Sequence, residues 1–321
     1  MKHFLSQIPI PMAGVSLGLA ALGNLLQNYS EGFRLFCGLF SFLMLALVIA
    51  KFIFCPSAIQ EDFKNPVVAG VSATIFMTLM QLSTYVYPYI GTAAMVIWAA
   101  AVIAHAALII YYTKMFLLRF RLEEIFPTCF ITYVGIVVAS VTSASFGLET
   151  LGQGIFWFGL FAYIVMFALI SYRYVKHEVH ESLKPLFCIY TAPMSLTITG
   201  YMAVMENKSI ASVIVMAVLA QLLYVAVLTQ LPKLMRIKFY PSYAAFTFPF
   251  VITATALKQV LAHLSAFYAV PQWMYVIVNL ETVIAVVMVG YTAIHFLTYL
   301  SKRLSDSINM SARIMGNSVE D

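Results

Sequence analysis

Ionisable side chains that could do chemistry are scarce inside the long apolar segments of this 321-residue sequence. Three stand out there: His105, Lys258 and Glu281. A charge is costly to bury in apolar surroundings, so each is a candidate for a functional role. Lys258 could attract anions, could extend its ammonium group to an aqueous surface, or could pair with Glu281. For His105 the sequence favours a packing hydrogen bond over proton transfer.

Catalytic and metal-binding motifs give little support to an enzyme. The segment KHEVHE at 176–181 places its histidines at i and i+3 in a charged loop, whereas the zinc helix motif needs i and i+4. No phosphate-binding loop, nucleophile elbow or paired acids occur in the apolar segments. The sequence therefore predicts no enzyme, no metal and no cofactor.

Four free thiols are expected, because no C-x-x-C pair occurs among Cys37, Cys55, Cys129 and Cys188.

The composition identifies an integral membrane protein. Hydrophobic residues make up 62% of the chain and charged residues only 10%, and the mean hydropathy is +0.92. Apolar segments long enough to cross a membrane as helices need about 20 residues each. Ten such segments are predicted, at 9–28, 32–54, 66–86, 88–113, 127–146, 150–174, 185–205, 209–231, 241–264 and 270–300. They form one domain, 1–301, followed by a short cytoplasmic tail, 302–321.

Basic residues set the expected orientation in the membrane. All but three of the 18 lysines and arginines fall on one side when loops alternate, the exceptions being Arg34, Lys208 and Lys258. Because short basic loops stay cytoplasmic, both termini are expected in the cytoplasm of a multi-pass plasma-membrane protein. The net charge of +5 then needs no nucleic-acid partner. A cleavable signal peptide is the alternative for the N-terminus, but that segment belongs to a repeat.

The repeat is marked by prolines at the cytoplasmic entrance of each odd-numbered span. Their separations are 55, 61, 58 and 56 residues, for Pro11, Pro66, Pro127, Pro185 and Pro241. Proline suits a first helical turn, so the unit is a helical hairpin repeated five times. Odd spans are rich in small residues and even spans in bulky ones. Small residues serve either close helix packing or a lumen, and the repetition favours a quasi-fivefold pore of odd helices.

A candidate gate lies in the segment YPSYAAFTFPF at 240–250. At 100° per residue Phe246 and Phe250 share a face with Leu257, whereas Phe248 points the other way with Ala244 and Thr255. A ring in a narrow lumen could block it, although all three rings could instead pack against helices or lipid. Counting about seven or eight residues from the proline of each odd span reaches Gly18, Thr74, Gly135, Pro193 and Phe248, which are therefore predicted to lie at one level of the pore. A kink at Pro249 is expected to hold the Phe248 ring. The other candidates that line the pore are Ala244, Thr255 and Thr142.

The hairpin repeat, AFTFPF at 245–250, GVSLGLAALG at 14–23 and TSAS at 142–145 resemble the tellurite-resistance and dicarboxylate transporter family. This family includes bacterial tellurite-resistance homologues and plant slow-type anion channels. The resemblance covers residues 8–300. It implies a homotrimer of independent pores, each blocked by a phenylalanine of the ninth helix that matches Phe248 here. The long soluble tails that control the plant branch have no counterpart in this sequence.

Two functions follow as expectations. The first is a gated channel for small anions in a lipid bilayer, and the alternative is a proton-coupled transporter of C4-dicarboxylate, sulfite or tellurite. A carrier needs a substrate-binding charge and a titrating partner, for which Lys258, Glu281 and His105 are the candidates inside the spans. The channel is therefore preferred. A membrane-bound enzyme or receptor is disfavoured by the missing catalytic constellation and soluble domain.

Overall fold

The computed structural model describes the backbone of residues 2–317 and the side chains of residues 2–309. The regular secondary structure of residues 2–317 is entirely helical, as expected from the sequence. The helices are α1 (Lys2–Ser6), α2 (Met12–Leu26), α3 (Glu31–Phe54), α4 (Pro56–Asp62), α5 (Pro66–Val71), α6 (Ala73–Ile90), α7 (Thr92–Tyr112), η1 (Thr113–Leu117), η2 (Leu122–Glu124), α8 (Thr128–Tyr133), α9 (Val137–Ser143), η3 (Ala144–Phe146), α10 (Glu149–Lys176), η4 (Glu181–Thr191), α11 (Ala192–Val204), α12 (Ile210–Leu234), η5 (Pro241–Phe246), α13 (Phe248–Leu264) and α14 (Gln272–Asn317).

Nine helical segments of the described chain are long and apolar enough to cross a membrane. The tenth predicted span, 9–28, corresponds to α2, which has 15 residues. At about 1.5 Å per residue α2 is shorter than a bilayer core of about 30 Å. Thirteen of its residues, from Met12 to Leu25, are buried by neighbouring helices. Because α2 contacts protein rather than lipid, it need not match the bilayer thickness.

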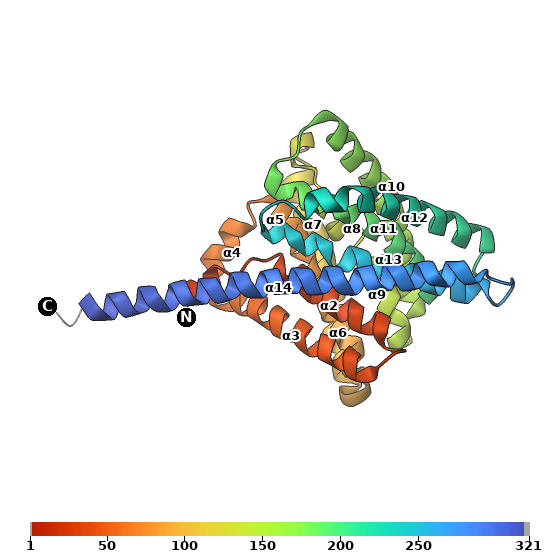
Figure 1. Cartoon of the computed structure of the whole chain (residues 1–321), viewed down its shortest axis with the longest axis horizontal. Helices are drawn as coiled ribbons and strands as arrows, with labels where there is room; N and C mark the ends of the chain where they lie inside the picture. The colour runs from red at the N-terminus through yellow and green to blue at the C-terminus, as the bar shows by residue number, and fades with distance from the viewer. Residues whose placement is uncertain (1, 318–321) are drawn as a thin grey trace.

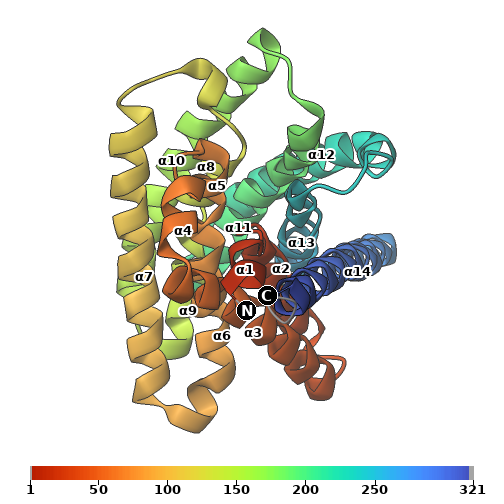
Figure 2. The same cartoon turned by 90° about the vertical axis from the view of Figure 1, so that its left-hand side faces the viewer.

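Five helices form a closed ring at the centre of the molecule. In order around the ring, α2 contacts α6, α6 contacts α9, α9 contacts α11, α11 contacts α13, and α13 returns to α2. Each of these inner helices also contacts the helix that follows it in the chain, giving the hairpins α2–α3, α6–α7, α9–α10, α11–α12 and α13–α14. Figure 2 shows α2, α11 and α13 towards the middle, with α7, α10, α12 and α14 outside. The predicted quasi-fivefold arrangement of five hairpins is confirmed.

Burial separates the inner helices from the outer ones. In the inner segments, which include α6, α9, α11 and α13, 67–83% of the apolar stretch of 18 residues is buried inside the protein. In the outer segments this share is 22–39%. The exposed faces of the outer helices carry large apolar side chains such as Phe42, Ile103 and Leu222. An apolar exposed surface of this extent is stable in lipid and would be insoluble in water.

Local sequence explains how the hairpins start and turn. Ser30 accepts a hydrogen bond from the Phe33 N–H and so caps α3. Asn65 caps α5 in the same way, and Pro66 follows at the first position, where its missing N–H loses no bond. Gly91 connects α6 to α7 in a single residue with φ of 51°. This positive φ is readily available only to glycine, which permits so tight a turn.

Three of the inner segments are interrupted within the bundle, whereas the sequence predicted only a kink at Pro249. The α5–α6 segment is interrupted at Ser72, the α8–α9 segment at residues 134–136, and η5 gives way to α13 at Thr247. The expectation that all five inner helices start alike is wrong for the fourth, since Pro185 lies inside the 3₁₀ helix η4.

The last helix, α14, extends well beyond the bundle. It runs for 46 residues without a break and passes the predicted boundary at residue 301. At about 1.5 Å per residue it is about 69 Å long, more than twice the thickness of a bilayer core. Figure 1 shows its C-terminal part projecting from the same end of the molecule at which α1 lies. Residues 318–321 of the predicted tail lie outside the described residues.

Candidate functional site

A cavity of about 210 Å³ lies inside the ring of inner helices. Its mouth is lined by residues at the helix entrances, including Pro11, Asn65, Ser182 and Ser242. All five hairpins contribute to its wall, and no charged residue is among the described residues that line it. The cavity is therefore an apolar vestibule that opens at the end of the molecule where the inner helices begin.

Phe248 is one of the side chains that line this cavity. Its ring is 6% exposed, and it lines the cavity together with Thr74, Gly135 and Pro193 from three other inner helices. Counting residues from the proline of each inner helix predicted that these residues lie at the same depth in the pore. Gly18, assigned to the same level, does not line the cavity, where α2 instead presents Gly14 and Leu17. Phe248 thus shares the wall of the cavity with small residues and a proline from the other inner helices.

Thr247 fixes the backbone just before Phe248. Its hydroxyl group donates hydrogen bonds to the Gly14 carbonyl oxygen of α2, at 3.0 Å, and to the Ala244 carbonyl oxygen, at 2.7 Å. Its backbone has φ of −106° and ψ of −92°, outside the helical region. A Cβ atom on Gly18 would lie 2.5 Å from the Thr247 Cβ. Only glycine at position 18 therefore lets α2 approach the break between η5 and α13 this closely.

The break does not occur where the sequence suggested. A kink at Pro249 was expected to hold the ring, but Pro249 lies in the first turn of α13, and the irregular backbone is at Thr247. The physical reason is that a first-turn residue has no intrahelical partner for its N–H, so proline there does not interrupt the helix. Pro249 still lines the cavity beside Phe248.

Phe246 and Phe250 both point away from the cavity. Each is fully buried at 0% exposure. The Phe246 ring lies 4.8 Å from the Tyr243 ring, and the Phe250 ring meets Tyr224 of α12 edge-on at 5.9 Å. The three phenylalanines therefore divide into one ring in the cavity and two in the packed protein, which is the division that the helical phase predicted.

The remaining pore candidates from the sequence lie in different environments. Ala244 lines the cavity. Thr255 is half-buried nearer the other end of α13, where its hydroxyl donates to the Val251 carbonyl oxygen. The Thr142 hydroxyl accepts a hydrogen bond of 2.7 Å from Trp98 of α7. Neither threonine lines the cavity, so only Ala244 of these three belongs to it.

His105 supports a break in the third inner helix. Its Nε2 atom lies 2.9 Å from the Thr132 carbonyl oxygen, and the imidazole is fully buried. The break at residues 134–136 removes the helical N–H partner that this carbonyl would otherwise have. A carbonyl oxygen can only accept, so the Nε2 atom of His105 carries the proton. His105 thus replaces a missing backbone bond beside Gly135, in keeping with its expected packing role.

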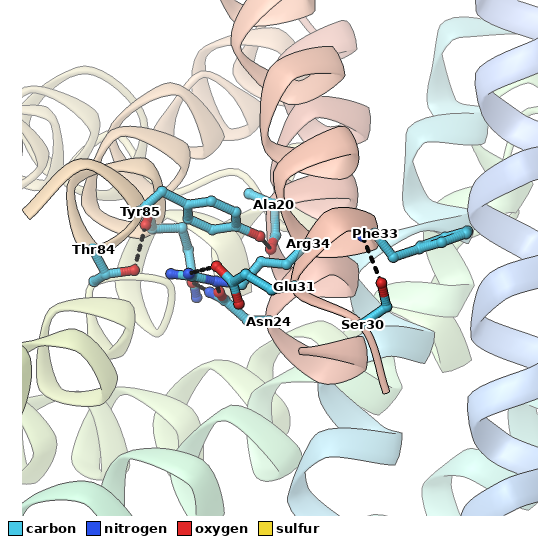
Figure 3. A network of polar contacts seen from close by, with 9 residues as sticks. Ala20, Asn24, Ser30, Glu31, Phe33, Arg34, Thr84 and Tyr85 are labelled. Atoms are coloured by element: carbon cyan, nitrogen blue, oxygen red, sulfur yellow. Dashed lines mark hydrogen bonds and ion pairs between the residues drawn. The ribbon is translucent and has the colours of Figure 1, made fainter. Parts of the chain in front are cut away.

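The end of the bundle opposite the cavity mouth holds a polar network (Figure 3). Arg34 of α3 donates to Glu31 at 2.7 Å and to Asn24 of α2 at 3.1 Å, and its guanidinium lies 4.2 Å from the centre of the Tyr85 ring. The Tyr85 hydroxyl in turn donates to the Ala20 carbonyl oxygen. The network joins α2, α3 and α6, and Glu31 balances the charge of Arg34.

Lys258 lies at the same end but has no acidic partner among residues 2–309. Its ammonium group donates to the Leu25 carbonyl oxygen at 3.2 Å and lies 5.4 Å from the centre of the Tyr29 ring. A cation suits the last turn of α2, where carbonyl oxygens are left without partners. The alternative pairing with Glu281 does not occur.

Two residues of the site were missed by sequence reasoning. Thr247 was read only as part of the aromatic segment, although a threonine next to a Phe-Pro pair is a plausible break point. Lys238 was counted only for topology. Its ammonium group lies 5.3 Å from the centre of the ring of Tyr240, which lines the cavity mouth, and a hydrogen bond to that side chain raises the pKa of Lys238. Lys238 therefore stays positively charged beside the mouth.

Comparison with known proteins agrees with this geometry. A search of curated proteins found no match to the chain. A family model described as a voltage-dependent anion channel matches residues 7–296, which includes every inner helix and the Phe248 region. This is the family that the sequence resembles, whose members are channels or transporters of anions. With nearly its whole length matched, the chain belongs to the voltage-dependent anion channel family.

Proposed function

We propose that this protein is a gated channel for small anions and that the Phe248 ring closes its pore. The observation that carries the proposal is that Phe248 lines a cavity to which all five hairpins contribute. An apolar ring at a constriction excludes water and so raises the barrier to an ion.

Helix direction supports anions as the permeating species. Four inner helices, α6, α9, α11 and α13, begin at or beside residues that line the cavity. The N-terminal end of a helix carries a partial positive charge, worth about 0.3 to 1 kcal/mol to a nearby anion. Because these ends converge on a cavity without acidic side chains, the cavity favours an anion over a cation. Lys238 at the mouth adds a positive charge.

The alternative, a proton-coupled carrier of dicarboxylate, sulfite or tellurite, has less support. A carrier would need a titrating group and a cation at its substrate site. Lys258, Glu281 and His105 are the candidates, and none of them lines the cavity. Lys258 could still draw anions towards the opposite end of the pore, because no carboxylate neutralises it.

The proposal is tested by truncating the ring and measuring anion flux into liposomes at a set voltage. Phe248→Ala should raise the flux at least tenfold, which requires a barrier only about 1.4 kcal/mol lower. Phe248→Leu should raise it less, because leucine still fills part of the constriction. A proton-sensitive dye recorded in the same liposomes distinguishes the carrier, for which proton entry would accompany each anion.

Phe246→Ala and Phe250→Ala are the matched controls, because each removes the same atoms from a packed position. Both should leave the flux low and reduce stability, by about 3 to 5 kcal/mol if the cost resembles that in soluble cores. The gate proposal fails if Phe248→Ala is silent in folded protein, or if either control opens the pore instead.

We also propose the orientation and assembly expected from the sequence, with both termini in the cytoplasm of the plasma membrane and three chains in the assembly. The basic loops support the first, and family resemblance supports the second. Mass photometry of the protein in lipid nanodiscs would measure the number of chains, and any value other than three would contradict the trimer.

A further inference from the structure

Glu281 of α14 is a buried acidic residue that the pore does not use. Its side chain is only 2% exposed, neither carboxyl oxygen has a hydrogen bond of good geometry, and the Gln221 side chain of α12 is a neutral donor close by. No lysine, arginine or histidine of the described residues forms an ion pair with it. An ionised carboxylate that has no cation beside it, and at most a neutral amide as donor, is strongly disfavoured in an apolar interior. The neutral acid is therefore the form that fits this packing.

The neighbours of Glu281 connect it to the helix that carries the gate. Tyr224 of α12 lies close enough to interact electrostatically with Glu281, is 2% exposed, and has a hydroxyl group without a partner. Gln221, one turn away on α12, is the other polar neighbour. The Tyr224 ring also packs edge-on against Phe250 of α13, two residues beyond Phe248. Two buried polar side chains, Tyr224 and Glu281, thus lie near each other beside the gate helix.

Other titratable side chains on the surrounding helices contact residues other than Glu281. On α13, Lys258 bonds the Leu25 carbonyl and His263 packs against Phe267. On α14 itself, His295 and Tyr291 pack together beside Tyr243, more than two turns along the helix. The inner helix α2, which also packs against α14, contains no titratable side chain. Tyr224 is therefore the titratable group that faces Glu281.

We propose that Glu281 is a proton-binding site whose protonated form holds α12, α13 and α14 in the packing that keeps Phe248 in the pore. This rests on the proposed channel function and names a regulation of its gate. When the carboxyl ionises, it needs water or new donors, which the closed packing does not provide. The closed conformation therefore binds the proton more tightly than a conformation in which α12 and α14 separate.

Linkage gives the direction of the pH effect. Since the closed form binds the additional proton, acid favours closing, and closing weakens as the pH rises. One proton changes the ratio of closed to open channels by at most about tenfold per pH unit. Anion flux should accordingly rise from about pH 5 to about pH 9, a range above the ordinary titration of an exposed glutamate.

Flux into liposomes across this pH range tests the regulation. Glu281→Gln keeps the size of the side chain and mimics the neutral acid, so its flux should stay low and independent of pH. Glu149→Gln, at the exposed start of α10, is the matched control and should retain the pH dependence of the unchanged protein. Phe248→Ala should conduct at all pH values, because the gate itself is absent. A full pH response in Glu281→Gln, or an unchanged relative pH response in Phe248→Ala, overturns the proposal.

Infrared spectroscopy tests proton binding without requiring conduction. A protonated carboxylic acid has a carbonyl stretch that is distinct from the carboxylate bands. The acid band of the unchanged protein should fall as the pH is raised, and Glu281→Gln should lack that component. If the chain conducts no anion but the band behaves in this way, the channel function fails while the proton site stands. If Glu281→Gln leaves the band unaltered, the proton site is rejected.

Discussion

Individual side chains in this protein compensate for irregular backbone near the pore. Thr247 bonds two carbonyl groups where η5 ends, and His105 bonds the carbonyl that the break after α8 leaves free. A buried carbonyl group without a hydrogen-bond partner costs about 1 to 3 kcal/mol of stability. Each of these hydrogen bonds removes that cost and so stabilises the helix break inside the membrane. Residues that preserve the shape of the pore therefore need not touch the ion.

This role of His105 predicts the effect of replacing it. His105→Leu should lower stability by about 1 to 3 kcal/mol, because the Thr132 carbonyl would be buried without a donor. His105→Gln keeps an N–H group at a similar reach and should lose less. Thermal unfolding in detergent, followed by the fluorescence of a thiol-reactive dye on the four buried cysteines, would measure both. Equal losses in the two variants would contradict the hydrogen-bonding role.

The helix breaks, and the side chains that face the pore around them, are the part of the site that the sequence predicted least well. Counting residues from each proline found the level of Thr74, Gly135, Pro193 and Phe248, because helical rise is nearly constant. It misplaced Gly18, because rotation about the helix axis also decides which side chain meets the lumen. The Thr142 contact depends on Trp98 from another hairpin, and no local pattern in the sequence specifies that neighbour.

The close approach of α2 to the break can be tested with two glycines. Gly18→Ala should destabilise the protein by about 1 to 3 kcal/mol, because its new methyl group would overlap the Thr247 side chain. Gly154→Ala in α10 is the control, since a Cβ there would meet nothing within 4 Å. It should be neutral or stabilising, as alanine is the better helix former. Thermal unfolding measures both, and similar losses would show that α2 can move aside.

At the scale of the whole molecule, the ring of five hairpins could be predicted because the same pattern occurs five times. Hydropathy located the spans, and the contrast between small and bulky residues separated inner from outer helices. The length of α14 could not be predicted in this way. Beyond residue 300 its sequence becomes polar, which marks the end of an apolar span but not the end of a helix.

Orientation is the prediction that belongs to this scale. A phosphatase that requires disulfide bonds should be inactive when fused after Asp321, because the cytoplasm keeps its thiols reduced. The same enzyme inserted between Asn207 and Lys208, in the loop that joins α11 to α12, should be active. A cytoplasmic fluorescent reporter at the two positions should give the opposite pattern. An active phosphatase at the C-terminus would invert the proposed topology.

The unbroken course of α14 has a practical consequence for attaching other proteins. Because the helix continues through Asn317, a soluble domain that begins with its own helix could be joined there in phase. Each alanine inserted at the junction would rotate that domain by about 100° and move it outward by about 1.5 Å. The membrane protein would thus hold its passenger at a chosen angle, as a rigid marker for aligning single particles in electron micrographs.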